Sequence, residues 1–389
     1  MEAKRCCIPS RASSGASRPS CRVRTRLLLG TAVATPAAED GHDTSAARVT
    51  GTRPLTLTAP SGPLRRMTAL VTGASGFLGR ALVRELLAGG HRVRALIRES
   101  GDASVLDRGV EVVRGDAMDP VALRRAVEGC PLVYHLAGVR RASDREAFLS
   151  VNAGSTRLLL AACLAGGAAR QRFVLAGSLA SMGPSRHGKR EEEAFAPAEW
   201  YGESKAEAER IARSFADRLP VAVGRPPRII GPGDRENLFF FRIVARGIAL
   251  RILGPERPLS WIDVDDCARG FVLLGERPEA VGETFFLASR ERTAFEQLQR
   301  EVARALGVRP RTLPVPPAVL TGLAWAADAV SNTSGHRLPL NRKLARQLLA
   351  PGWTCCTDKA QRLLGFSAPT PLAESVARAA RYYREHGLV

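Results

Sequence analysis

The sequence of 389 residues contains few aromatic residues and few cysteines: aromatics make up 5% of it, and its eight cysteines show no metal-type spacing. The shortage of aromatics, with no stretch that interleaves basic and aromatic side chains, argues against a nucleic-acid partner. No uninterrupted apolar run reaches the roughly 18–20 residues of a membrane helix, so we predict no stable membrane insertion. Five scattered cysteines after residue 66 indicate a reducing, cytoplasmic environment, and we predict no metal site.

Acidic residues are also scarce, since 38 Asp and Glu oppose 57 Lys and Arg to give a net charge of +19. This balance alone raises the idea of an anionic partner such as nucleic acid or phosphate. Eleven basic and four acidic residues place +7 of that charge within residues 1–66, which show no sustained periodicity. We predict that residues 1–66 are an unfolded extension. This extension has three possible explanations: translation starts at Met67, residues 1–66 are a targeting segment, or they are a solvated tail.

From Met67 onward, short apolar runs alternate with amphipathic segments of helical length. This rhythm predicts an α/β fold of the Rossmann type, a doubly wound parallel sheet whose ligand lies at the carboxyl ends of the strands. We expect a dinucleotide-binding domain over residues 67–235 and a smaller substrate-binding lobe over 236–389, interleaved with the sheet. The pattern predicts strands at 68–72, 92–97, 110–113, 132–135, 172–176 and 221–224, and helices at 81–88, 121–127, 155–165 and 204–216.

Three glycines directly follow the first predicted strand. Glycine permits a positive φ in a tight turn and lets backbone N–H groups approach a pyrophosphate, which then faces a helix N-terminus. A glycine triplet alone is a weak indication, but this one follows a strand, opens a helix and begins a βαβ unit, as the dinucleotide fingerprint requires. The predicted pyrophosphate-binding turn comprises Gly73, Ser75, Gly76, Phe77, Leu78 and Gly79.

The ends of two strands predict how the rest of the nucleotide binds. Arg98 follows the second strand, where an arginine pairs with the 2′-phosphate of NADP, whereas an acid would bind the ribose hydroxyls of NAD. Because Arg98 comes before Glu99, we predict NADP, with NAD as the alternative. Asp116 closes the third strand beside Ala117, where its carboxylate can accept a hydrogen bond from the adenine amino group.

A tyrosine and a lysine four residues apart, Tyr201 and Lys205, form the second chemical signal. This spacing places the phenol and the ammonium on the same helix face. An ordinary phenol has a pKa of about 10, and a nearby positive charge favours the phenolate, so Tyr201 can exchange a proton with an alcohol or a carbonyl. Ser178 ends an earlier strand, where its hydroxyl can hydrogen-bond the substrate oxygen. We predict that these three residues are catalytic.

These residues resemble the extended short-chain dehydrogenase/reductases, also called the NAD-dependent epimerase/dehydratase family. The resemblance covers nearly everything after Met67, with further motifs at 133–138, 151–156, 224–234, 261–266 and 282–289. It implies that Lys205 also bonds the nicotinamide ribose and that Asn152 supports the site structurally. It further implies a homodimer formed through a helical face. The other cofactor-binding residues that it implies are Ala137, Gly138 and Pro226.

Two positions depart from the family pattern. Gly177 stands where family members often have a further serine, which leaves Ser178 as the candidate, and Met182 replaces the usual tyrosine of the next segment. Beyond residue 235, an apolar, proline-led segment at 313–328 resembles the branch that holds 3β-hydroxysteroid dehydrogenases and dihydroflavonol reductases. This segment packs as core between the two lobes or contacts a membrane surface.

The leading hypothesis is therefore an NAD(P)-dependent oxidoreductase that acts on a secondary alcohol or ketone of an apolar small molecule, steroid-like or flavonoid-like. The enzymatic alternative is a sugar-nucleotide epimerase or dehydratase that keeps NAD tightly bound. An alternative of another class is a non-catalytic NADP-binding sensor or RNA-binding protein, which the net charge of +19 favours and the shortage of aromatics disfavours.

Overall fold

The computed structural model describes residues 66–166, 172–334 and 340–389. They all belong to one structural unit, Leu57–Val389. The extension predicted over residues 1–66 lies outside the described residues except for Arg66. Strand β1 (Thr68–Thr72) follows Met67 directly, as the sequence predicts.

A seven-stranded sheet forms the centre of the fold, in the order β11-β7-β5-β4-β1-β2-β3, and every pair of neighbours is parallel. The strand order reverses between β1 and β4, and in such sheets ligands bind beside this reversal at the carboxyl ends. The predicted Rossmann-type fold is confirmed. Besides β1, the strands are β2 (Arg92–Ile97), β3 (Glu111–Arg114), β4 (Leu132–His135), β5 (Arg172–Ala176), β7 (Val221–Arg225) and β11 (Thr284–Phe286).

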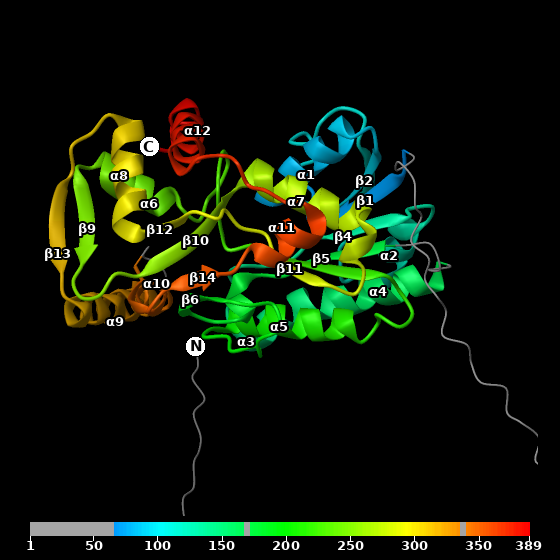
Figure 1. The fold of residues 1–389 in the computed structure, drawn as a ribbon, viewed down its shortest axis with the longest axis horizontal. Helices are drawn as coiled ribbons and strands as arrows, with labels where there is room; N and C mark the ends of the chain where they lie inside the picture. The colour runs from blue at the N-terminus through cyan, green and yellow to red at the C-terminus, as the bar shows by residue number, and fades with distance from the viewer. Residues whose placement is uncertain (1–65, 167–171, 335–339) are drawn as a thin grey trace, which may run out of the picture. The chain divides into compact units, whose positions relative to one another are not determined.

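Helices cover both faces of this sheet (Figure 1). Helices α1 and α7 pack together on one face and share an apolar cluster with β1 and β2. On the other face, α2, α4 and α5 form a second apolar cluster. Strands β4, β5 and β7 are buried along their whole length because both of their faces are covered. These helices are α1 (Phe77–Ala88), α2 (Pro120–Val127), α4 (Ser155–Ala165), α5 (Trp200–Arg213) and α7 (Val264–Glu276), and α11 (Asp358–Leu364) contacts β11.

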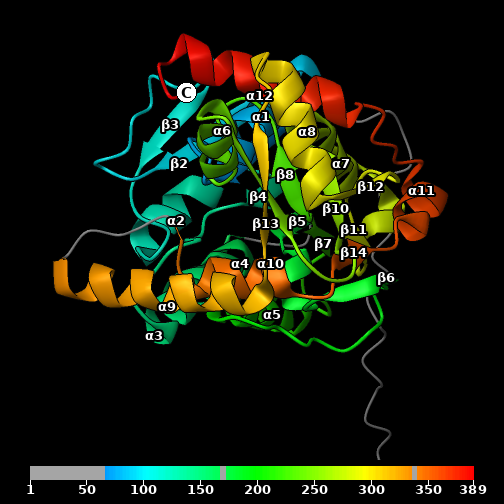
Figure 2. The same ribbon diagram turned by 90° about the vertical axis from the view of Figure 1, so that its left-hand side faces the viewer.

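Elements outside the main sheet build a second sheet, β12-β10-β14-β6 with β8 beside β10, and a ribbon of β9 and β13. Figure 2 views this part with α8 and α12 above and α9 and α10 below. The boundary predicted for the substrate lobe, residue 236, stays a prediction. The strands are β6 (Ser185–Lys189), β8 (Arg228–Ile230), β9 (Ile248–Ile252), β10 (Pro258–Asp263), β12 (Arg292–Ala294), β13 (Arg311–Val315) and β14 (Trp353–Cys355). The helices are α6 (Leu238–Ala245), α8 (Phe295–Leu306), α9 (Pro317–Ser334), α10 (Arg342–Leu349), α12 (Leu372–Glu385) and the 3₁₀ turns η3 (Leu179–Ser181) and η4 (Pro278–Ala280).

One helical run joins α3 (Arg145–Leu149), the π-helical turn η1 (Ser150–Gly154) and α4. Among the described residues this run, Arg145–Ala165, is long enough and apolar enough on average to cross a membrane. It nevertheless contains no uninterrupted apolar stretch of that length. Half of it is buried inside the fold, where α4 packs on α2 and α5. The run is therefore accounted for as a core helix.

Two helices begin a full turn earlier than the sequence predicts. Helix α1 starts at Phe77 rather than residue 81, directly after Gly76, and α5 starts at Trp200 rather than residue 204. The first turn of each holds glycine and aromatic residues, whose low helix propensity hides the start of a helix in sequence. The earlier start of α5 places Tyr201 inside the helix, one turn before Lys205.

The apolar segment 313–328 is core on one side only, in a cluster with Phe240, Phe295 and Ala345, all within residues 236–389, so the expectation of core between two lobes stays a prediction. The segment spans the end of β13 and most of α9. Among the described side chains of α9, Leu320, Ala324 and Ala327 are buried, whereas large apolar neighbours on the other side are exposed. Helix α9 is therefore packed against the rest of the protein on one face, and its other apolar side chains remain exposed.

Candidate active site

The glycine turn between β1 and α1 has the backbone geometry of a diphosphate site. Gly73 has a φ of +72°, and a Cβ on it would lie 2.7 Å from the backbone nitrogen of Ala137, just after β4. Gly76 caps α1 without a side-chain hydrogen bond, so no side chain caps the first N–H groups of α1. The turn therefore fits a bound diphosphate. Of the other residues predicted for this turn, Ser75 is exposed, Phe77 and Leu78 are half-buried, and Gly79 is buried.

A substitution at Gly79 tests this turn. A Cβ on Gly79 would lie 2.1 Å from the carbonyl oxygen of Gly73, so we expect Gly79→Ala to distort the turn and lower the free energy of unfolding by about 1–3 kcal/mol. Its affinity for the dinucleotide should fall as well. Gly322→Ala is the matched control, because no atom lies within 4 Å of the added Cβ. Thermal unfolding and a nucleotide titration check both variants, and equal behaviour of the two would refute the proposed cradle.

The residues predicted to contact adenosine lie at the ends of β2 and β3. Arg98 directly follows β2 and is exposed, and its carbonyl oxygen accepts a hydrogen bond of 3.1 Å from Arg114. Asp116 is exposed beside the half-buried Ala117, and its Oδ1 accepts a hydrogen bond of 2.8 Å from the backbone nitrogen of Met118. The guanidinium of Arg98 has no hydrogen bond or ion pair within the described ranges. Both side chains are therefore accessible to a nucleotide.

Lys205 lies between the ends of β4 and β5. It is 7% exposed, and its Nζ donates a hydrogen bond of 2.8 Å to the carbonyl oxygen of Ala176, the last residue of β5. A Cβ on the exposed Gly138 would lie 3.6 Å from the same Nζ. Burial and the charge of Lys205 lower the pKa of His135 to about 3. The imidazole is therefore neutral at neutral pH, and the ammonium of Lys205 is the charge that this part of the site holds.

Tyr201 and Ser178 lie on neighbouring elements. Tyr201 is 9% exposed in α5, and Ser178 accepts a hydrogen bond of 3.1 Å from the backbone nitrogen of Ala180 at the start of η3. Helix α5 packs directly on η3, because a Cβ on Gly202 would lie 2.4 Å from the carbonyl oxygen of Ala180. The structure thus brings Lys205 and Ser178 to the end of β5 and holds Tyr201 on α5, against η3 and one turn before Lys205.

Two cations beside Tyr201 are absent from the sequence prediction. The guanidinium carbon of Arg140 lies 5.3 Å from the centre of the Tyr201 ring, and the Nζ of Lys343 lies 5.8 Å from it. Lys343 belongs to α10 and also pairs with Glu199 at 3.3 Å. Arg140 follows the 133–138 motif closely, which could have drawn attention to it. No sequence signal connects Lys343 with Tyr201.

Asn152 supports the site, as the resemblance implies. It lies in the π-helical turn η1 and is 1% exposed. Its Oδ1 accepts a hydrogen bond of 2.7 Å from the backbone nitrogen of Val139, and its Nδ2 donates to Val139 and, at 2.8 Å, to Ser204 of α5. One side chain therefore fixes the loop after β4 to the helix that carries Tyr201 and Lys205.

A buried ion pair fixes α5 to the end of β7. Arg225 and Glu209 are both 0% exposed, and their side chains approach to 2.7 Å. Arg225 also donates a hydrogen bond of 3.1 Å to the carbonyl oxygen of Glu191. The next residue, Pro226, is buried, and its carbonyl oxygen accepts a hydrogen bond of 3.0 Å from Leu179, which follows Ser178. Pro226 therefore lies next to the segment that carries Ser178, and its place in a nicotinamide pocket stays a prediction.

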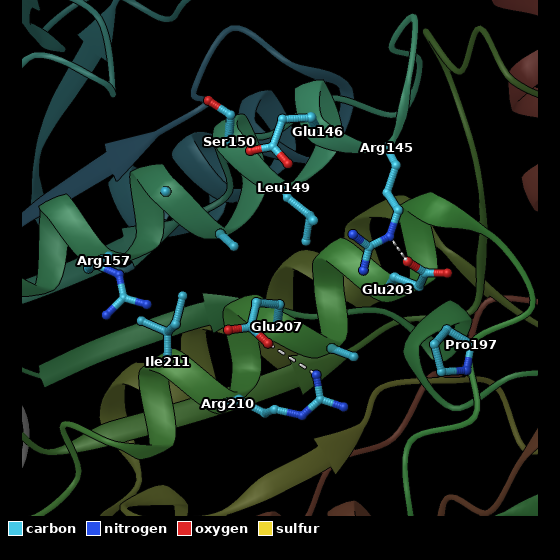
Figure 3. Close-up of a pocket in the computed structure, with 13 residues that line it drawn as sticks. Arg145, Glu146, Leu149, Ser150, Arg157, Pro197, Glu203, Glu207, Arg210 and Ile211 are labelled. Atoms are coloured by element: carbon cyan, nitrogen blue, oxygen red, sulfur yellow. Dashed lines mark hydrogen bonds and ion pairs between the residues drawn. The ribbon is translucent and has the colours of Figure 1, made fainter. Parts of the chain in front are cut away.

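A separate groove of about 630 Å³ lies on the opposite side of α5, between that helix and the run from α3 to α4 (Figure 3). The groove contains neither Tyr201 nor Lys205. Two ion pairs line it, Arg145 with Glu203 at 2.5 Å and Arg210 with Glu207 at 3.1 Å.

Within the described part of the chain no group of three or more His, Cys, Asp or Glu side chains is placed to hold a metal ion.

Comparisons with known proteins agree with this geometry. Residues 69–288 match the model of the NAD dependent epimerase/dehydratase family. The chain belongs to this family. Its relatives include a ceramide reductase of Caulobacter vibrioides, 33% identical over 83% of this chain and 96% of the relative. Sterol demethylase protein B of Methylococcus capsulatus is 31% identical, over 83% of this chain and all of the relative.

Solved structures give the same result. The structure of MoeE5 in complex with UDP-glucuronic acid and NAD has a TM-score of 0.65 and 25% identity, and the match covers 82% of this chain and 99% of MoeE5. As a member of the family, the chain is an NAD(P)-dependent dehydrogenase or reductase of the extended short-chain type.

Proposed function

We propose that this enzyme transfers a hydride between a nicotinamide cofactor and a secondary alcohol or ketone of an apolar small molecule. The observation that carries the proposal is the position of Lys205. Its ammonium is tied to the end of β5 and lies one helical turn from Tyr201, on the side of the glycine turn. A positive charge fixed beside an acid/base group stabilises the negative charge that develops on its oxygen when it gives up a proton.

The residues of this chain would divide the work as follows. Tyr201 donates a proton to the ketone oxygen during reduction or accepts one from the alcohol during oxidation. Ser178 donates a hydrogen bond to the same oxygen and orients it. The glycine turn, with Ala137, Gly138 and Pro226 beside it, would hold the dinucleotide, whose nicotinamide supplies or receives the hydride when bound.

The apolar character of the substrate is proposed from two relatives. They are 33% and 31% identical to this chain, and their names refer to a ceramide and a sterol. The functional test is a spectrophotometric assay of the purified full chain at the reduced-nicotinamide band. NADPH or NADH would be offered with oxidised sphingolipids, 3-oxosteroids, flavanonols and nucleotide sugars. No turnover of the lipid-like ketones would overturn this substrate class.

We propose NADP as the preferred cofactor because the exposed guanidinium of Arg98 stands at the end of β2. Arg98→Ala should lower the affinity for NADPH by about tenfold or more, since a charge-assisted pair with the 2′-phosphate is lost. The affinity for NADH should change little. Arg92→Ala is the matched control, because Arg92 is exposed at the opposite end of the same strand. Fluorescence titration of both cofactors checks this prediction, and parallel losses for NADH and NADPH would contradict it.

The epimerase alternative rests on the family as a whole, in which MoeE5 was solved with NAD and a sugar nucleotide. It predicts turnover of a nucleotide sugar without added nicotinamide. Assaying the purified protein with and without added cofactor separates the two reactions. Cytoplasmic location and a homodimer through a helical face also remain proposals. Free cysteines at five described positions suit a reducing compartment, and analytical ultracentrifugation measures the oligomeric state.

A further inference from the structure

Helix α9 presents large apolar side chains to solvent. Val319 is 49% exposed, Leu323 54% and Trp325 59%. The ribbon that leads into α9 exposes two more: Leu313 of β13 is 45% exposed, and Leu253, whose backbone nitrogen donates a hydrogen bond to the carbonyl oxygen of Val315, is 37% exposed. We call these five residues the α9 strip. Several large apolar side chains exposed on one helix and the ribbon before it mark a binding surface more often than single scattered ones do.

The opposite side of α9 anchors the helix firmly. Leu320 and Ala324 are 4% and 0% exposed and belong to an apolar cluster with Phe240 and Phe295. In Figure 2, α9 lies along the edge of the molecule, and α10 lies beside it. The strip is therefore held in place by the fold and is not a consequence of a loosely attached helix.

The surroundings of the strip are strongly basic. Among the described residues between 309 and 346, five exposed side chains are basic, and Asp328 is the single acid. Asp328 pairs with Arg342 at 3.0 Å, and the guanidinium of Arg342 lies 4.1 Å from the centre of the Trp325 ring. Within the part of the chain that the structure describes, no ion pair involves Arg309, Arg311 or Arg346. The five exposed basic residues are Arg309, Arg311, Arg342, Lys343 and Arg346.

The strip also lies close to the proposed active site. Helix α9 packs on α10, and α10 places Lys343 over the Tyr201 ring at 5.8 Å. The Nζ of Lys343 donates a hydrogen bond of 3.4 Å to the carbonyl oxygen of Arg140, the other cation beside Tyr201. A partner bound to the α9 strip would therefore lie next to α10, the helix that borders Tyr201.

We propose that the α9 strip docks this enzyme on the surface of an anionic lipid bilayer. The apolar side chains enter the interfacial region, with Trp325 at the level of the headgroups, and the arginines beside them contact acidic headgroups. A second copy of the chain fits less well, because a contact between two identical strips would bring two basic clusters together. The docking is peripheral and needs no membrane-spanning segment, and it does not depend on which apolar substrate the enzyme takes.

Vesicle flotation of the full chain tests the proposal. The probes are vesicles of phosphatidylcholine alone and vesicles that contain phosphatidylglycerol as well. We expect binding to the anionic vesicles, and we expect Leu323→Glu with Trp325→Glu to lower the partition coefficient by about tenfold or more, because apolar contacts are lost and negative charge is added. Val121→Glu is the matched control, since Val121 is 55% exposed on the distant helix α2. Thermal unfolding of both variants verifies that they fold.

Three outcomes would overturn the docking. The first is no binding of the wild-type chain to anionic vesicles. The second is unchanged binding of the double variant, which would assign vesicle binding to another basic surface such as residues 1–66. The third is a change of sedimentation coefficient in the double variant without a change in vesicle binding, which would identify a second copy as the occupant. Tyr201→Phe should float like the wild type, and the double variant should still reduce a water-soluble ketone, so failure of the docking and failure of the proposed reaction are distinguishable.

Discussion

Tyr201→Phe should lower kcat by about 10²–10⁴-fold, the usual contribution of a positioned acid/base group. The substitution removes the phenolic oxygen, and with it the proton that would pass to the substrate. The ring remains, so its packing on Phe148, with 6.3 Å between ring centres, and its contacts with Arg140 and Lys343 remain as well. Single-turnover measurements at the reduced-nicotinamide band give the rate, and a titration gives the dissociation constant of NADPH.

The dissociation constant of the cofactor should stay within about twofold of the wild-type value, because a loss that affects only the transition state leaves ground-state binding intact. Tyr382→Phe is the matched control. It removes the hydroxyl group of a tyrosine whose ring stacks on His386 at the end of α12, with 3.9 Å between ring centres. A Tyr201→Phe enzyme as fast as this control would exclude Tyr201 as the proton donor.

Glu209→Ala is expected to lower the free energy of unfolding by about 3–5 kcal/mol, the cost of leaving one partner of a buried ion pair without its counter-charge. The remaining Arg225 guanidinium would be fully buried, with the carbonyl oxygen of Glu191 as its other acceptor. The pair joins α5 to β7, so we also expect the orientation of Tyr201 and Lys205 to loosen. Chemical denaturation measures the stability.

Glu207→Ala provides the comparison, since Glu207 lies on the same helix and pairs with Arg210 at 3.1 Å on an exposed surface. Exposed pairs contribute about 0–1 kcal/mol, so this variant should unfold almost like the wild type. Similar losses for both variants would show that α5 responds to any lost carboxylate and that burial of the Glu209 pair is not the cause.

Much of the cofactor side of the site could be predicted because its signals are local. The turn at Gly73 depends only on the backbone freedom of that glycine and on its immediate neighbours. Helices and strands can be predicted from the periodicity of apolar residues along the chain. The ends of β1, β2, β4 and β5 agree with the prediction to the residue. The starts of α1 and α5 were predicted a turn late, because glycine and aromatic residues weaken the helical signal there.

The substrate side could not be predicted to the same extent. The contacts of Arg140 and Lys343 with Tyr201 depend on where α10 packs, and side-chain charge carries no information about distant partners. The apolar segment 313–328 likewise gave two readings, because it is apolar on every face and its periodicity does not say which face is covered.

The sequence by itself determined the βαβ order, the glycine turn, and the four-residue spacing of Tyr201 and Lys205. Each of these follows from the backbone preferences and spacing of neighbouring residues. Only the tertiary structure decided that Lys205 is tied to Ala176, that Arg225 and Glu209 form a fully buried ion pair, and that one side of α9 is left exposed. These features join residues far apart in the chain, and their positions follow from how whole helices and strands pack against one another.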